Sequence, residues 1–124
     1  MKNLYLLVFT ALFTMCSFTL SIEDVIAGIK NGNAAQVSKF FDNTVELTLT
    51  DKSNAYSKSQ AELVLKDFFT TNTVKNFVVL HKGDNAGSQF CIGTLETKNG
   101  AYRTTIYMKQ VGDKQVVQEL RFEK

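Results

Sequence analysis

Four apolar and aromatic runs near the C-terminus constrain the fold of this chain most strongly. They occupy residues 77–80, 90–92, 102–108 and 116–122. Each run is bounded by Gly, Asn or Asp, and the chain contains no proline. Enrichment in β-branched and aromatic residues between such turn residues is typical of strands joined by hairpins. Residues 74–124 are therefore predicted to form four successive antiparallel strands.

A tight turn is predicted at residues 98–101. Asn99 and Gly100 suit a two-residue type I′ turn, because both central positions of that turn need a positive φ. Counting back from the turn divides the two strands into two faces. The more apolar face is assigned to the core, and its pairs are Leu95 with Thr104, Gly93 with Ile106, and Cys91 with Met108. The other face pairs Glu96 with Arg103, Thr94 with Thr105, and Ile92 with Tyr107.

The turn near Gly112 leaves two registers open. A two-residue loop places Val117 and Glu119 beside Met108 and Ile106, whereas a three-residue loop places Leu120 and Phe122 there. A slip of one residue turns the whole apolar set of a strand to the other face. Burial of apolar side chains favours the three-residue loop or a bulge.

Residues 1–21 have the composition of an export signal. Lys2 is followed by an uncharged, mostly apolar stretch from residue 4 to residue 20, and small residues lie near its end. Cleavage there would leave Ile22 as the first residue of an exported chain, in the periplasm or outside the cell. Two alternatives are a retained membrane anchor, for which the stretch is short, and a lipoprotein acylated at Cys16.

Charge and cysteine content limit the partners of residues 22–124. Without Lys2, this part carries 13 basic and 12 acidic side chains and no basic run. It therefore lacks the charge expected for binding nucleic acid or an anionic membrane. Cys91 is its only cysteine, so no internal disulfide is expected. Its place on the core face favours a small buried side chain over a reactive thiol.

Two short helices and one strand are predicted to follow the export signal. Ser21 resembles an N-cap, and an apolar stripe with helical spacing follows it at Ile22, Val25, Ile26 and Ile29. Asn33 is the predicted N-cap of the second helix. Residues 45–50 alternate as a half-buried strand does, and residues 52–55 are predicted to form a polar loop.

The longest helix is predicted to begin at Ser59, where Ser59 and Glu62 form a capping box. It carries a broad apolar stripe and ends near residues 70–73. The stripe consists of Ala61, Val64, Leu65, Phe68 and Phe69. The four C-terminal strands are the only surface large enough to cover it. The predicted class is α+β, with three helices on one face of a cone-like, curved antiparallel sheet, in the order α-α-β-α-β-β-β-β.

This order of elements resembles the nuclear transport factor 2-like superfamily. More narrowly, residues 56–61, before a helix that ends in residues 66–69, look like those of a family of small exported bacterial proteins of unassigned function. The resemblance covers residues 22–124. It implies a pocket between the concave sheet face and the helices, and often a dimer formed through the other sheet face. The superfamily includes enzymes and noncatalytic binding modules, so the fold does not choose a function.

The chain offers little catalytic chemistry. A single histidine excludes a site with two histidine ligands, and no H-E-x-x-H, C-x-x-C, G-x-S-x-G or phosphate-loop pattern occurs. We therefore predict no catalytic residue, no metal site and no cofactor.

Three residues are predicted to bind a ligand: Tyr56, His81 and Tyr107. His81 ends a predicted strand, where it is either a base or donor at a pocket mouth or an exposed strand-end residue. Tyr56 precedes the longest helix, near the expected opening of the cone. The two tyrosines supply hydroxyls, although tyrosine in small sheets commonly serves packing. Glu119 would enter the cone only with the two-residue loop.

The leading functional hypothesis is a noncatalytic exported module. It would hold a small apolar ligand or a protein partner in the cone cavity or on the outer sheet face. The first alternative is an isomerase or hydrolase that uses His81 with a carboxylate. The second is a homodimeric interaction domain. No nucleic acid and, after signal cleavage, no membrane is expected as a partner.

Overall fold

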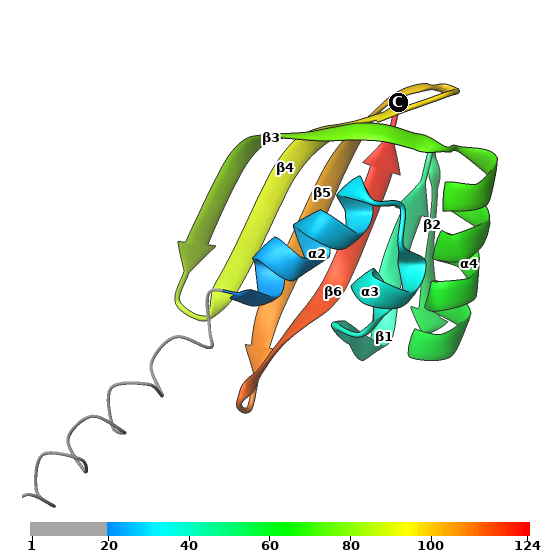
Figure 1. The fold of residues 1–124 in the computed structure, drawn as a ribbon. Helices are drawn as coiled ribbons and strands as arrows, with labels where there is room; N and C mark the ends of the chain where they lie inside the picture. Colours follow the sequence, from blue (N-terminus) through cyan, green and yellow to red (C-terminus); the bar gives the residue numbers. More distant parts are fainter. Residues whose placement is uncertain (1–19) are drawn as a thin grey trace, which may run out of the picture.

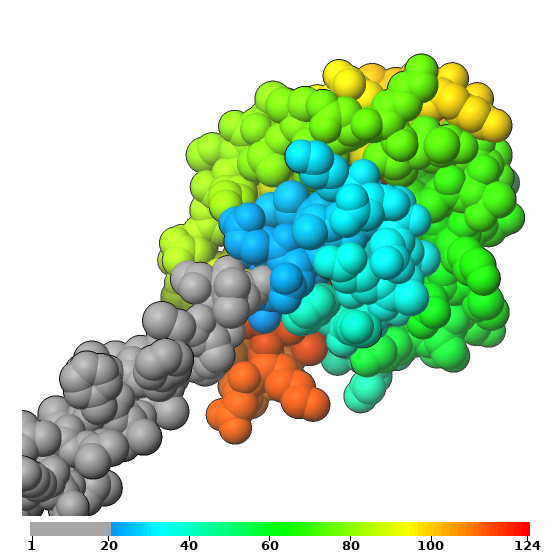
Figure 2. Space-filling model, viewed as in Figure 1, coloured from blue at the N-terminus to red at the C-terminus, as the bar shows by residue number. Residues whose placement is uncertain are grey.

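A computed structural model describes residues 20–124 as a curved six-stranded sheet with three helices on its inner face (Figures 1 and 2). The expected α+β class is confirmed. The predicted export signal lies outside the described residues except for its last two positions. The elements in chain order are α2 (Leu20–Lys30), α3 (Ala34–Ser38), β1 (Phe41–Leu49), β2 (Lys52–Ser57), α4 (Lys58–Thr71), β3 (Val74–Asn85), β4 (Ser88–Thr97), β5 (Gly100–Val111) and β6 (Lys114–Glu123).

The strands follow the order β2-β1-β6-β5-β4-β3 across the sheet. The predicted meander, β3 to β6, is confirmed, and every neighbouring pair except one is antiparallel. The exception is β1, which pairs in parallel with β6. The last strand in the chain therefore joins the N-terminal hairpin to the meander.

Strand β2 was not predicted, since residues 52–55 were expected to form a loop. It pairs along its whole length with β1, and all of its residues except Tyr56 are exposed. Both faces of this edge strand meet solvent, so its sequence shows no alternation between apolar and polar residues. The element order consequently has one strand more than expected.

The helix starts were predicted with mixed success. Asn33 is the N-cap of α3, as expected, and its side chain accepts a hydrogen bond from the Gln36 amide at 3.1 Å. The expected N-cap Ser59 is wrong, because Ser57 caps α4 through the amide of Gln60. Ser21 is also no N-cap, because α2 already includes Leu20.

The turn between β4 and β5 differs from the predicted one. Lys98 and Asn99 form the loop, so Glu96 lies opposite Ala101, not Arg103, and Arg103 lies opposite Thr94. The Asn99 side chain donates hydrogen bonds to the Thr71 carbonyl and to Asn72, which draws this residue toward the end of α4. A shift of two residues preserves the faces, so the predicted core face is correct.

The turn between β5 and β6 combines features of both open registers. Gly112 and Asp113 form a two-residue loop, and an irregularity follows between the pairs Tyr107–Glu119 and Met108–Val117. This bulge turns Leu120 to lie opposite Ile106, and it places Glu119 on the outer face. The expectation of a bulge, which rested on burial, is confirmed.

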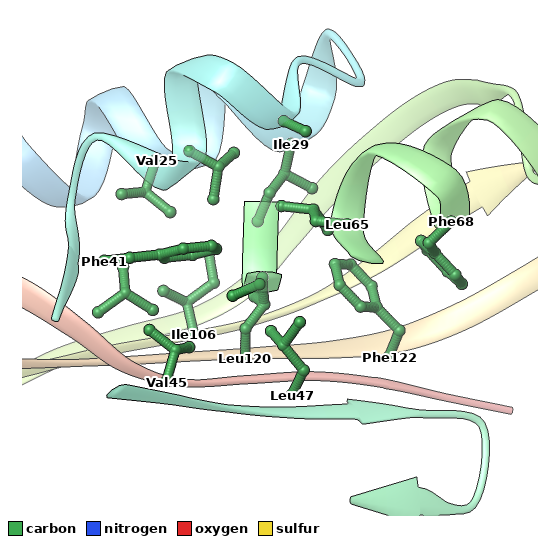
Figure 3. Packing of buried hydrophobic residues seen from close by; sticks show 14 of the residues in the cluster. Val25, Ile29, Phe41, Val45, Leu47, Leu65, Phe68, Ile106, Leu120 and Phe122 are labelled. Carbon is green, nitrogen blue, oxygen red and sulfur yellow. The ribbon is translucent and has the colours of Figure 1, made fainter. Parts of the chain in front are cut away.

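The core lies between the helices and the inner face of the sheet (Figure 3). Val25 and Ile29 of α2 and Leu65 of α4 point toward Leu120 and other sheet residues. The rings of Phe68 and Phe122 stack with 4.6 Å between their centroids. The expected stripe of α4 is therefore confirmed as the contact with the sheet.

Asn72 connects the end of α4 to the sheet. It is buried, its side chain donates to the Phe68 carbonyl at 3.0 Å, and its Oδ1 accepts from the Tyr102 hydroxyl at 3.0 Å. The same oxygen accepts from the Asn99 side chain at 3.0 Å. A single side-chain amide thus donates to a carbonyl at a helix end and accepts from donors on a strand and in a turn.

Replacing Asn72 with alanine is expected to destabilise the protein by about 1–3 kcal/mol, because the buried Tyr102 hydroxyl loses its acceptor. In the Tyr102→Phe background the same replacement should cost less. The difference, measured by urea unfolding of the four proteins, should give a coupling energy of about 1 kcal/mol. Additive effects would show that this hydrogen bond does not contribute to stability.

Candidate functional site on the outer sheet face

Side chains fill the interior of the cone. Phe41, Leu65, Phe68, Ile106 and Phe122 are all buried between the helices and the sheet, and Figure 3 shows them converging there. Interiors packed in this way have few voids larger than a water molecule. A ligand site on this protein is therefore to be sought in a surface cleft or on the outer face of the sheet.

The structure separates Tyr56 from the other two predicted ligand-binding residues. Tyr56 lies on β2, opposite the buried Val45, and its half-buried ring packs against the core. His81 lies on β3, at the other border of the sheet. These two residues belong to opposite edges and do not share a site.

His81 and Tyr107, by contrast, share the outer face. His81 lies opposite Ile92, Tyr107 lies opposite Phe90, and the His81 and Phe90 rings are 5.4 Å apart. The Tyr107 hydroxyl and Ser88 Oγ are 3.1 Å apart, within hydrogen-bond distance. Phe90 and Ile92 alternate with the buried Cys91, which is the signal that places both on the outer face.

These side chains form one surface with Val78, which lies opposite Thr94 on the same face. We call it the outer patch and define it as Val78, His81, Phe90, Ile92 and Tyr107. Val78 is 41% exposed and Tyr107 is 37% exposed. Phe90 was not singled out from the sequence, and His81 was expected at a strand end, although β3 continues to Asn85.

Charged residues of both signs border the outer patch on β5 and β6. Arg103 lies opposite Glu123, and Glu119 forms an ion pair with Arg121. Glu119 is therefore a partly exposed member of an ion pair on the outer face, not a carboxylate inside the cone. The border carries no excess of one charge.

The chemistry of the remaining titratable groups is limited. Burial raises the pKa of the Cys91 thiol to about 11, so this thiol stays protonated and unreactive at neutral pH. A hydrogen bond to Glu23 raises the pKa of Lys82 above its usual value. Within residues 20–124, no cluster of three or more His, Cys, Asp or Glu side chains could hold a metal ion.

One open cleft lies between the start of α2 and the β3–β4 hairpin. It has a volume of about 390 Å³, and its walls include Ile22, Phe90 and the ion pair between Glu23 and Lys82. Gln89 also lines the cleft, and its buried Oε1 accepts no hydrogen bond from the described part of the chain. The cleft thus offers apolar surface and an ion pair to a small ligand.

No helix within the described residues is long and apolar enough to cross a membrane. The fold itself is shared with a bacterial protein of known structure. An NTF2-like protein of unknown function from Cytophaga hutchinsonii matches with a TM-score of 0.61 and 8% identity, covering 82% of this chain and 84% of that one. The architecture is therefore the nuclear transport factor 2-like (NTF2-like) fold.

The family follows from closer matches. The family model described as "Domain of unknown function (DUF4783)" matches residues 22–123, and the chain belongs to this family. A DUF4783 family protein from Bacteroides uniformis is 34% identical, with a TM-score of 0.80, and the match covers 82% of this chain and 94% of that one. Its counterpart from Bacteroides ovatus is also 34% identical, with a TM-score of 0.79 and coverage of 82% and 92%. No curated protein matches the chain.

Proposed function

We propose that this protein is a noncatalytic binding module, acting after export, whose outer patch docks onto another protein. One observation carries the proposal: aromatic and aliphatic side chains gather on the outer face of β3, β4 and β5, while the interior of the cone is already filled. Contiguous exposed apolar surface is typical of interaction sites. Aromatic residues in such a patch are the side chains that most often dominate binding energy.

The border of the patch supports a protein as the partner. Arg103, Glu119, Arg121 and Glu123 place both signs of charge beside the apolar residues. A polar rim around an apolar centre is the usual composition of a protein interface. An anionic membrane or a nucleic acid would instead favour a surface of one sign.

The structure weakens the enzyme hypothesis. The His81 ring is exposed on the outer face beside Phe90, and the two ion pairs among the described residues, Glu23–Lys82 and Glu119–Arg121, do not involve it. A general base needs a positioned partner and protection from water. His81 is better explained as an aromatic member of the outer patch.

A second candidate function is supported by the cleft beside α2. The ion pair between Glu23 and Lys82 and the apolar surface of Ile22 suit a small amphipathic ligand. Native mass spectrometry of the purified protein tests this: a mass excess that disappears on denaturation supports a bound ligand. A bare mass that stays bare after incubation with the soluble extract of the same cells counts against it.

The docking proposal is tested by photo-crosslinking in an expressing bacterium. A photoreactive phenylalanine analogue replaces Ile92 in the outer patch, and the control replaces Leu63, which is 66% exposed on α4. We expect one discrete adduct from the Ile92 position only. Tyr107→Glu, in the same protein, should lower the yield about tenfold if Tyr107 is an anchor of the interface. Adducts of the same pattern and yield from both positions, or from neither, would refute docking at the outer patch.

A further inference from the structure

Strand β3 leaves one border of the sheet unpaired, and the middle of that border is apolar. It comprises twelve residues at the end of the sheet opposite to β2 (Figure 1). Three consecutive residues are exposed there: Val78 at 41%, Val79 at 38% and Leu80 at 65%. The other border, β2, has only six residues and no large exposed hydrophobic side chain. The two edges of one sheet therefore differ in length and in chemistry.

Exposed edge strands normally carry features that prevent pairing, such as charge, proline or short length. The middle of β3 carries none of these three; a bulge, which can also hinder pairing, lies at Leu80. No backbone hydrogen bond in the described chain reaches β3 except those of its ladder with β4. Its outward amides and carbonyls are thus available to another strand.

The bulge determines which side chains share a face. Phe77 lies opposite the buried Leu95, and Lys82 lies opposite the buried Cys91, so both are on the inner face. Val78 and His81 lie on the outer face by the same criterion, as members of the outer patch. In a regular strand, residues 77 and 82 would point to opposite faces. Because of the bulge, residues 77 and 82, which lie at equal distances from the centre of β3, are on the same face of the sheet.

The β3 strands of two copies can therefore pair with each other about a two-fold axis. A two-fold axis between Val79 and Leu80 lies at the midpoint of the strand, so all twelve residues find partners. From Asn76 to Gly83, inner residues meet inner residues, as Phe77 meets Lys82 of the second copy, and outer residues meet outer ones; a second irregularity lies at Lys75. Near each end Lys75 lies opposite Asp84 of the second copy. A register two residues further along would instead set Phe77 against Asp84 and would unite no opposite charges.

We propose that β3 pairs in antiparallel with β3 of a second copy, with Lys75 opposite Asp84 at both ends. The two six-stranded sheets then form one continuous sheet. This interface uses the edge of the sheet. Of the outer patch only Val78 and His81 lie in it, and Phe90, Ile92 and Tyr107 stay outside, so it does not rest on the docking function proposed above. A contact of one strand from each copy is small, which makes a weak, concentration-dependent dimer the expected state.

Cysteine crosslinking tests the register in the protein as the cell produces it. In the proposed dimer Val78 faces His81 of the second copy twice, at the Cβ separation of directly opposed residues, which a disulfide can bridge. Val78→Cys combined with His81→Cys should give a covalent dimer on mild oxidation. The control, Val78→Cys with Asn85→Cys, should not, because these positions are four residues out of register. Equal dimer yields from both pairs, or none from either, would overturn the proposal.

Charge reversal tests the ends of the interface independently. Lys75→Asp is expected to weaken the dimer about three- to tenfold, measured by sedimentation at several concentrations, because two ion pairs are replaced by two repulsions. Lys75→Asp with Asp84→Lys should restore the association of the original chain. Both residues are exposed, so folding is not at risk. If neither variant changes the strength of association, this register is wrong. The Tyr107→Glu variant, which tests docking, should dimerise normally.

Discussion

Replacing Leu65 with alanine is expected to lower the free energy of unfolding by about 2–5 kcal/mol. Leu65 is fully buried on α4, and Figure 3 shows it between α2 and the sheet. Truncation removes its apolar contacts with both layers and leaves a cavity that packed neighbours refill only in part. Denaturation by urea, followed by circular dichroism, measures the change as a lower midpoint with an unchanged slope.

Leu63 provides the matched control, because the same helix carries it two residues away with 66% of its surface exposed. Leu63→Ala removes the same atoms without creating a cavity and should change stability by no more than about 0.5 kcal/mol. Losses of similar size at the two positions would mean that α4 does not pack on the sheet through Leu65.

Gly93→Ala is expected to produce the second large effect, a loss of about 1–3 kcal/mol or more. A Cβ at this position would lie 2.6 Å from the Val78 carbonyl oxygen and 2.7 Å from the Phe77 ring. The oxygen belongs to the backbone of β3, near the bulge at Leu80. Removing this clash therefore requires β3 and β4 to move apart. Thermal unfolding of the variant should show a lower midpoint.

Gly83→Ala separates backbone crowding from side-chain crowding. A Cβ there would lie 2.5 Å from the Phe90 ring, which is half-buried at the edge of a surface cleft and has room to turn. We expect Gly83→Ala to be clearly milder than Gly93→Ala. The reverse order would show that the bulge in β3 adapts more easily than the Phe90 ring.

The periodicity of the sequence predicted which faces are buried, but not which residues lie opposite each other. Cys91 and Leu95 were assigned to the core face, and both are buried. The predicted partner of Glu96 was wrong by two residues. Because a shift of two residues leaves every face unchanged, the apolar pattern does not distinguish the two registers. The turn is set by hydrogen bonds from Asn99 to Thr71 and Asn72, which are distant in sequence and leave no local signal.

The candidate site was predictable only in part for a related reason. Alternation along β4 and β5 placed Ile92 and Tyr107 on the outer face, as the structure has them. The position of His81 depends on the bulge at Leu80, which reverses the alternation beyond it. Strand β2 escaped prediction because edge strands exposed on both faces need no apolar pattern.

The central position of β6 determines the order in which the sheet can be completed. Strands β1 and β5 contact β6 on its opposite sides, so β6 (residues 114–123) joins the hairpin of β1 and β2 to the strands β3 to β5. A growing chain can form both parts early, but they join only when β6 is available. The parallel contact between β1 and β6 closes a loop of some seventy residues, a long-range step that slows folding. The molecule therefore completes its core only once β6 has been synthesised.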